Sequence, residues 1–336
     1  MTQPSPLCPN RMQVHSIQQE TADVWTLNLI CDVFYPYQPG QFALVSIRNS
    51  EDTLRAYTLS SSPGQSRFLS ISVRCLPDGV GSRWLTGEVK PGNTLWLSDA
   101  QGEFSCEQHP ADRYLMLAAG CGVTPIISMC RWLVANRPAC DIAVIFNVRT
   151  PADTIFAEQW RELCATHPQL RLTLMAEQDI QPGYLNGRIS AEVLRQAAPD
   201  ITERTVMTCG PAPYMAQAER LCLQLGVAAD RFHKEQFHTP AATDGEQGEG
   251  LTLRTARPLR EFRVPVGSSS TLLAAMEAHA LPVNAACRAG VCGSCKTRIL
   301  EGDYTTTSSM TLTAAEIAQG YVLACSCQLQ GDVTLA

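Results

Sequence analysis

Three cysteines fall within the nine residues of Cys287–Cys295, late in a chain of 336 residues. Their spacing is Cys-x4-Cys-x2-Cys, and Cys325 and Cys327 follow. This is the plant-type spacing for a [2Fe–2S] centre held by four thiolates. Gly290 and Gly293 permit the tight backbone that points N–H groups at the sulfurs of such a loop. The first three predicted ligands are Cys287, Cys292 and Cys295.

Other interpretations of these cysteines stay open at this point. A zinc site could join Cys292 and Cys295 to the later pair, but it leaves Cys287 without a role. A thioredoxin-like pair would lie where a strand runs into a helix, which this glycine-rich loop does not resemble. The cysteines could also be purely structural. The fourth cluster ligand is undecided between Cys325 and Cys327, because both would point the same way if they shared one strand.

A second candidate site is the turn Gly120-Cys-Gly-Val-Thr-Pro125, directly after the apolar run Tyr114–Ala119. A turn from a buried strand into a helix presents backbone N–H groups to a pyrophosphate. The turn is not the Rossmann Gly-x-Gly-x-x-Gly, because Pro125 takes the third position, where it suits a first helical turn. A companion Cys209-Gly-Pro follows the strand expected over Thr205–Thr208.

Two charged residues bear on which nucleotide such a turn would bind. Arg149 follows the second strand of this region, where it could meet a 2′-phosphate. Asp153 could instead bind a ribose hydroxyl. The residues alone leave NADH and NADPH open.

The third candidate site is the string Arg55-Ala-Tyr57-Thr58. A strand that presents an aromatic ring, a hydroxyl and an arginine suits an anionic flavin nucleotide, through stacking and phosphate binding. Short strings of this kind also arise by chance, so an ordinary exposed strand is the alternative.

Three groups of elements must position these residues. Short strands separated by Pro-Gly turns precede Tyr114, which is typical of a barrel or sandwich. Strands and helices alternate from Tyr114 to Leu225, the signature of a parallel α/β layer. A small acidic stretch at 239–250 reads as a linker, and a hairpin is expected over Leu251–Val266 before the cysteine segment.

Composition excludes several classes of protein. A net charge of −6 gives no reason to expect nucleic-acid binding. The N-terminus lacks a secretory pattern, and glycines and a proline interrupt the apolar segment Tyr114–Met129, which argues against a membrane span. We therefore expect a cytoplasmic protein whose 15 cysteines are metal ligands or buried residues rather than disulfides.

The three motif sets occur in the order found in the ferredoxin–NAD(P) reductase superfamily, in members with a C-terminal plant-type ferredoxin unit. The segments Gln38–Phe42, Gly79–Ser82 and Gly102–Phe104 add to this resemblance, although Thr58 replaces the usual serine. The resemblance implies a multidomain fold. Its expected parts are an antiparallel β-barrel flavin domain (8–109), an α/β nucleotide-binding domain with a parallel sheet (110–238), the linker (239–250) and an α+β, β-grasp ferredoxin domain (251–336).

The resemblance also implies roles for individual residues. It favours FAD over FMN, assigns no side chain as acid or base, and puts Cys209 near the nicotinamide. The implied flavin contacts are Arg55, Tyr57, Thr58, Gly81, Ser82 and Phe237. The implied nucleotide contacts are Gly120, Gly122, Thr124, Cys209, Gly210 and Pro211. Leu323-Ala-Cys325 is similar to the family's fourth-ligand site, which selects Cys325.

The activity implied is that of an NADH-dependent electron-transfer reductase. Hydride would pass from the nicotinamide to the flavin, and single electrons would pass on to the cluster and then to a protein partner. Along its full length the chain resembles reductases of hybrid cluster proteins, which implies such a protein, associated with nitric oxide or hydroxylamine reduction, as acceptor. The segments behind this are 12–31, 145–160, 204–215 and 321–332. A reductase serving an oxygenase, or a non-enzymatic zinc-bearing interaction module, are the alternatives.

Overall fold

A computed structural model of the chain describes residues 4–51, 53–179, 181–235, 237, 250–264, 271–288 and 290–336. The predicted linker lies outside these residues except for Gly250. The chain forms two compact units. The first comprises Met1–Asn49 and Tyr57–Phe237, and the second comprises Ser50–Ala56 and His238–Ala336.

The N-terminal strands form a six-stranded antiparallel sheet in the order β4-β3-β6-β1-β2-β5. The strands are β1 (Asn10–Gln19), β2 (Val24–Cys31), β3 (Phe42–Ser46), β4 (Leu54–Thr58), β5 (Leu69–Arg74) and β6 (Thr94–Leu97). Leu59, just past β4, bridges to Ile71 on β5, so the two edges of the sheet meet as in a barrel. Met12, Leu27 and Ile71 lie fully buried in its core, and helix α1 (Val80–Gly87) follows β5.

The middle of the chain forms a parallel sheet in the order β10-β9-β8-β7-β11-β12. Its strands are β7 (Arg113–Ala119), β8 (Asp141–Val148), β9 (Leu170–Ala176), β10 (Tyr184–Asn186), β11 (Thr205–Cys209) and β12 (Phe232–Glu235). Its helices are α2 (Val123–Asn136), α3 (Ala157–Thr166), α4 (Ala191–Ala197) and α5 (Ala212–Gln224). Strand order reverses between β7 and β11, which makes a topological switch point.

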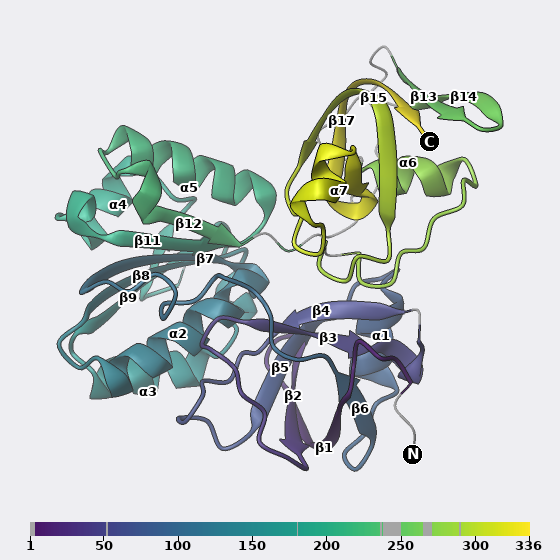
Figure 1. Cartoon of the computed structure of the whole chain (residues 1–336). Helices are drawn as coiled ribbons and strands as arrows, with labels where there is room; N and C mark the ends of the chain where they lie inside the picture. Colours follow the sequence, from purple (N-terminus) through teal and green to yellow (C-terminus); the bar gives the residue numbers. More distant parts are fainter. Residues whose placement is uncertain are drawn as a thin grey trace. The chain divides into compact units, whose positions relative to one another are not determined.

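Helices cover both faces of this parallel sheet, with α2 and α3 on one face and α4 and α5 on the other (Figure 1). Tyr114 and Met116 pack in the core beneath α2 and α3, whereas Leu115 and Leu117 face the core beneath α4 and α5. Because β7 is buried on both faces, its sequence is almost entirely apolar. No helix in the described part of the chain is long and apolar enough to cross a membrane.

The C-terminal unit contains a five-stranded sheet in the order β14-β13-β17-β15-β16. Its elements are β13 (Leu251–Ala256), β14 (Leu259–Val264), α6 (Leu272–Ala278), β15 (Lys296–Thr306), α7 (Ala314–Ala318), β16 (Tyr321–Leu323) and β17 (Cys327–Leu335). The central strand β17 runs parallel to β13 and antiparallel to β15. Leu253, Leu272 and Val333 pack in its core.

A single strand containing both Cys325 and Cys327, which the sequence left possible, does not form. β16 ends at Leu323, and a 3-10 turn over Ala324–Ser326 separates it from β17. The Ser326 hydroxyl donates to the Leu323 carbonyl at 3.1 Å, a local bond that competes with strand pairing. Cys325 therefore belongs to a turn, and Cys327 begins a strand.

Candidate functional sites

The two predicted glycine turns meet at the carboxyl ends of β7 and β11. A Cβ atom on Gly122 would lie 2.0 Å from the Cys209 carbonyl oxygen, so only glycine fits there. A Cβ atom on Gly210 would lie 3.0 Å from the Ala119 Cβ. The two turns therefore pack closely at the topological switch point between β7 and β11. Parallel sheets commonly bind ligands at such a point.

Some of the residues predicted to contact the nucleotide line a cavity, and others hold the turns beside that cavity in place. Gly120, with φ of +52°, and Pro211 line the cavity. The buried Thr124 hydroxyl donates to the Cys121 carbonyl at 2.9 Å and so holds the turn. Cys209 is fully buried, and burial raises the pKa of its thiol well above the ordinary value. Its thiol is therefore neutral.

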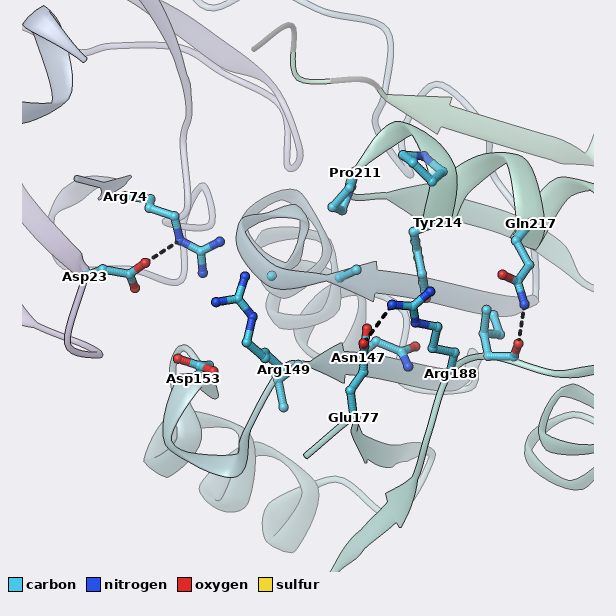
Figure 2. Close-up of a pocket in the computed structure, with 15 residues that line it drawn as sticks. Asp23, Arg74, Asn147, Arg149, Asp153, Glu177, Arg188, Pro211, Tyr214 and Gln217 are labelled. Atoms are coloured by element: carbon cyan, nitrogen blue, oxygen red, sulfur yellow. Dashed lines mark hydrogen bonds and ion pairs between the residues drawn. The ribbon is translucent and has the colours of Figure 1, made fainter. Parts of the chain in front are cut away.

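The cavity measures about 410 Å³ and takes residues from both the barrel and the α/β layer (Figure 2). From the barrel come Arg74 and Asp23, whose Nε and Oδ2 atoms lie 3.1 Å apart. A Cβ atom on Gly120 would lie 3.4 Å from Arg74 Nη1, so this guanidinium lies beside the turn. Sequence reasoning missed Arg74, because no motif near β5 links it to a turn in another layer.

Arg149 and Asp153, which the sequence offered as alternatives for reading the nucleotide, both line the cavity. One Asp153 oxygen accepts hydrogen bonds from the Thr150 backbone N–H and hydroxyl, at 3.0 and 2.9 Å. Arg149 has no ion pair among the described residues. Glu177 and Arg188, also on the cavity wall, form an ion pair of 3.0 Å.

The three predicted flavin residues on β4 have different surroundings. Thr58 is 4% exposed, and its hydroxyl finds no hydrogen-bond partner in the described part of the chain. Tyr57 packs half-buried against the barrel core. Within the second unit, Arg55 donates to the carbonyls of Leu54 and Ala286 at 2.7 and 3.1 Å. The orphaned Thr58 hydroxyl fits a bound group that offers a polar edge to this strand.

The other predicted flavin residues lie at the start of α1 and after β12. Gly81 and Ser82 are buried in the first turn of α1. Ser82 Oγ accepts from the Leu76 N–H at 3.1 Å and donates to the Gly79 carbonyl at 3.2 Å. The Ser82 hydroxyl is thus engaged within the turn, while the first-turn N–H groups suit a phosphate. Phe237 is 37% exposed.

Glu235 ends β12 opposite Cys209 in the strand register. Its Oε2 atom is buried without a hydrogen-bond partner among the described residues. Burial raises the pKa of Glu235 to about 8, so the carboxyl is mostly protonated at neutral pH. A Cβ atom on Gly102 of the barrel would lie 3.7 Å from Glu235 Oε1, so this carboxyl faces the barrel.

In the C-terminal unit, four predicted cluster thiols come together. Cys295 Sγ lies 3.3 Å from Cys325 Sγ, and the Gly290 N–H donates to Cys325 Sγ at 3.1 Å. A hydrogen bond with Cys287 raises the pKa of Cys292, and one with Cys325 lowers the pKa of Cys295. Hydrogen bonds with Cys287 and then with Cys295 raise the pKa of Cys325, so the four thiols form one linked group.

The chemistry of the donor set bears on which group these thiols could hold. Within the described residues, no three or more His, Cys, Asp or Glu side chains converge on one ion. Four cysteines in one linked group match the four thiolates that hold a [2Fe–2S] cluster. Cys327 instead lies fully buried in the hydrophobic core, where burial raises its pKa to about 12. The donor set fits a [2Fe–2S] cluster with Cys325 rather than Cys327.

Comparison with known proteins defines the class of protein. The model of an oxidoreductase FAD-binding domain matches residues 12–106, that of an oxidoreductase NAD-binding domain matches 116–220, and that of a 2Fe-2S iron-sulfur cluster binding domain matches 256–330. The solved structure of phthalate dioxygenase reductase aligns with a TM-score of 0.64 and 21% identity over 97% of both chains. The chain belongs to the ferredoxin–NAD(P) reductase superfamily, among its members with a C-terminal ferredoxin unit.

Individual relatives narrow this class. The chain is 56% identical to the NADH oxidoreductase HCR of Escherichia coli (strain K12), over the full length of both. It is 32% identical to the glycine betaine monooxygenase reductase subunit of Chromohalobacter salexigens, over 91% of this chain and 89% of that one. The predicted multidomain fold, oxidoreductase class, and FAD, NAD and [2Fe–2S] cofactors are confirmed.

Proposed function

We propose that this chain takes electrons from NADH and delivers them, through FAD and a [2Fe–2S] cluster, to a hybrid cluster protein. The observation that carries the proposal is the full-length similarity to the NADH oxidoreductase HCR, together with a complete set of four cluster thiols on the same chain. The structure describes all 15 cysteines and has none of them in a disulfide, which suits a reducing compartment, and we propose the cytoplasm.

The bound groups supply the redox chemistry, since a flavin exchanges hydride with a nicotinamide and single electrons with an iron–sulfur cluster. The chain supplies binding and exclusion of water. Arg74 and the N–H groups of the Gly120 turn would hold the pyrophosphate, where a cation and free backbone donors meet. Cys209 is fully buried and would exclude water from the nicotinamide end, and Glu235, whose Oε2 atom is buried, keeps its proton at neutral pH.

The proposed contacts follow from the motifs and from the geometry that supports them. For FAD they are Arg55, Tyr57, Thr58, Gly81, Ser82 and Phe237. For the nucleotide they are Gly120, Gly122, Thr124, Cys209, Gly210 and Pro211. For the cluster they are Cys287, Cys292, Cys295 and Cys325. The domains proposed are 8–109, 110–238 and 251–336, with the linker at 239–250.

The test is an anaerobic titration followed by turnover. Purified protein should show flavin and [2Fe–2S] absorbance that NADH bleaches faster than NADPH. NADH oxidation should then depend on added hybrid cluster protein with hydroxylamine as final acceptor. A colourless protein that holds zinc would overturn the proposal entirely.

An oxygenase reductase is the competing function, because a relative at 32% identity is named a monooxygenase reductase subunit. The same assay with a purified glycine betaine monooxygenase component in place of hybrid cluster protein separates the two. Faster turnover with the oxygenase component would contradict our choice of acceptor while leaving the reductase chemistry intact.

A further inference from the structure

Two buried polar atoms in the wall of the nucleotide cavity have no hydrogen-bond partner among the described residues. One is Oδ1 of Asn147, a side chain that is 6% exposed, and the other is the hydroxyl of Tyr214. Burial raises the pKa of Tyr214, so its hydroxyl keeps its proton and can donate. A buried polar group left unsatisfied is costly, so both atoms call for a partner that enters the cavity.

The two residues reach the cavity from different elements. Asn147 is at the carboxyl end of β8, where it pairs with Ala119 of β7. Tyr214 is in the first turn of α5, and Figure 2 shows its side chain extending toward the side of the cavity that holds Asn147 and Arg188. A Cβ atom on Gly210 would lie 3.1 Å from Tyr214 Cδ1, so the ring packs on this turn and its direction is fixed.

The position of Asn147 and Tyr214 along the carboxyl edge of the sheet indicates which half of a dinucleotide they would contact. The Gly120 turn, at the end of β7, is the pyrophosphate site of the proposed function. Cys209 and Glu235 end β11 and β12 on one side of it, where Glu235 faces the barrel that holds the flavin. The nicotinamide must meet that flavin, so the adenosine half belongs on the other side, at β8. Asn147 lies there.

The chemistry of the two atoms fits a sugar hydroxyl. An amide oxygen accepts a hydrogen bond, and a phenolic hydroxyl donates one. A ribose hydroxyl offers both complementary functions, since it can donate to Asn147 Oδ1 and accept from Tyr214. A 2′-phosphate is mostly a dianion at pH 7 and has no proton for the amide oxygen.

We propose that Asn147 and Tyr214 form a ribose-reading pair that recognises the adenosine ribose of NADH and disfavours its 2′-phosphorylated form. The proposal rests on the proposed function, in that the cavity binds a pyridine dinucleotide. It adds two specificity-determining residues to the proposed nucleotide contacts.

Equilibrium binding to the oxidised holoprotein tests the pair without turnover. ADP-ribose, 2′-phospho-ADP-ribose and nicotinamide mononucleotide are titrated by calorimetry. Tyr214→Phe removes one hydroxyl and should weaken ADP-ribose binding by about fivefold to tenfold, with nicotinamide mononucleotide unaffected. Asn147→Asp keeps the acceptor but adds charge. It should retain ADP-ribose within about threefold and weaken the 2′-phosphorylated ligand by at least about tenfold.

The matched control is Tyr184→Phe, because the Tyr184 hydroxyl already has a partner, Thr154 Oγ1 at 2.9 Å. Its ADP-ribose affinity should equal that of the wild type. Unchanged ADP-ribose binding in a folded Tyr214→Phe protein overturns the ribose-reading pair. A loss confined to nicotinamide mononucleotide overturns it too, because the pair would then read the other half. If the wild type itself fails to bind ADP-ribose, the proposed function fails instead.

Discussion

Three of the four proposed cluster ligands come from one short segment, Cys287–Cys295, and the fourth comes from the turn at Cys325. The nucleotide cavity is assembled from residues as far apart as Asp23 and Gln217, on the barrel, on several sheet strands and on α5. The spacing of residues in the sequence is therefore enough to predict most of the cluster ligands. The residues of the cavity are brought together only by the tertiary fold, and among them only the glycine turns form a motif in the sequence.

The difference also concerns what holds each site. The cluster loop is held from outside by neighbouring hydroxyl residues. A Cβ atom on Gly290 would lie 2.8 Å from the Ser308 Cβ, and one on Gly293 would lie 2.9 Å from Thr311 Oγ1. The cavity turns are held by each other, through Gly122 and the Cys209 carbonyl. We therefore expect the cluster site to be lost when one ligand is replaced. We expect the nucleotide cavity to be disrupted when a packing contact between its turns is changed.

The largest expected effect is the loss of the fourth thiol. Cys325→Ser should abolish the [2Fe–2S] absorbance and reduce electron delivery to the acceptor by more than about 100-fold, because one iron loses a ligand. Flavin reduction by NADH should stay within about twofold. Absorbance and stopped-flow kinetics measure both.

Cys327→Ser is its matched control, two residues away and fully buried in the core. It should keep the cluster and lose only some stability. If Cys327→Ser lost the cluster and Cys325→Ser kept it, the fourth ligand would be Cys327. The fourth ligand would then lie at the start of β17 and not in the 3-10 turn.

The next effect concerns the packing of the two glycine turns. Gly122→Ala puts a methyl group 2.0 Å from the Cys209 carbonyl oxygen, and backbone cannot yield as a flexible side chain can. We expect a loss of about 2–3 kcal/mol in the free energy of unfolding and at least about tenfold weaker ADP-ribose binding. Chemical denaturation and calorimetry provide the readouts.

Gly87→Ala offers the comparison, because a Cβ atom at this helical glycine meets nothing within 4 Å. It should leave ADP-ribose affinity unchanged and should not lower stability. If Gly122→Ala behaves like Gly87→Ala, the two turns do not depend on each other, and the cavity is less distributed than we describe.

The last prediction concerns the pH dependence of stability at Glu235. Its pKa is about 8 in the folded chain against the ordinary 4.5, so the unfolded state releases a proton that the folded state keeps. Stability should therefore fall as pH rises from about 4.5 to 8, at a slope on the order of 1 kcal/mol per pH unit. Glu235→Gln should flatten this slope, as measured by denaturation at several pH values. Equal slopes in both proteins would contradict a protonated Glu235.

The sequence predicted elements best where burial leaves a continuous apolar run. The apolar run Tyr114–Ala119 lies within β7. The edge strands β10 and β12 were not predicted, because three or four residues at a sheet edge need no apolar run. The split between Cys325 and Cys327 was equally invisible, since it depends on a hydrogen bond by Ser326.

Candidate site residues follow the same division. The spacing of Cys287, Cys292 and Cys295 could be read directly, because one loop wraps one compact group. Arg74 and Asn147 could not, because each is an unremarkable residue at a strand end until the fold brings it to the cavity. Their role depends on neighbours that are distant in sequence.

The central position of β17 in the C-terminal sheet has a consequence for biosynthesis. Ribosomes make Cys287, Cys292 and Cys295 first, while Cys325 and the strand that joins β13 to β15 emerge only afterwards. Iron offered to the nascent chain would therefore meet three unprotected thiols without the fourth. Cluster insertion should wait until β17 has paired, so that the apo unit, rather than the growing chain, is the substrate of cluster assembly.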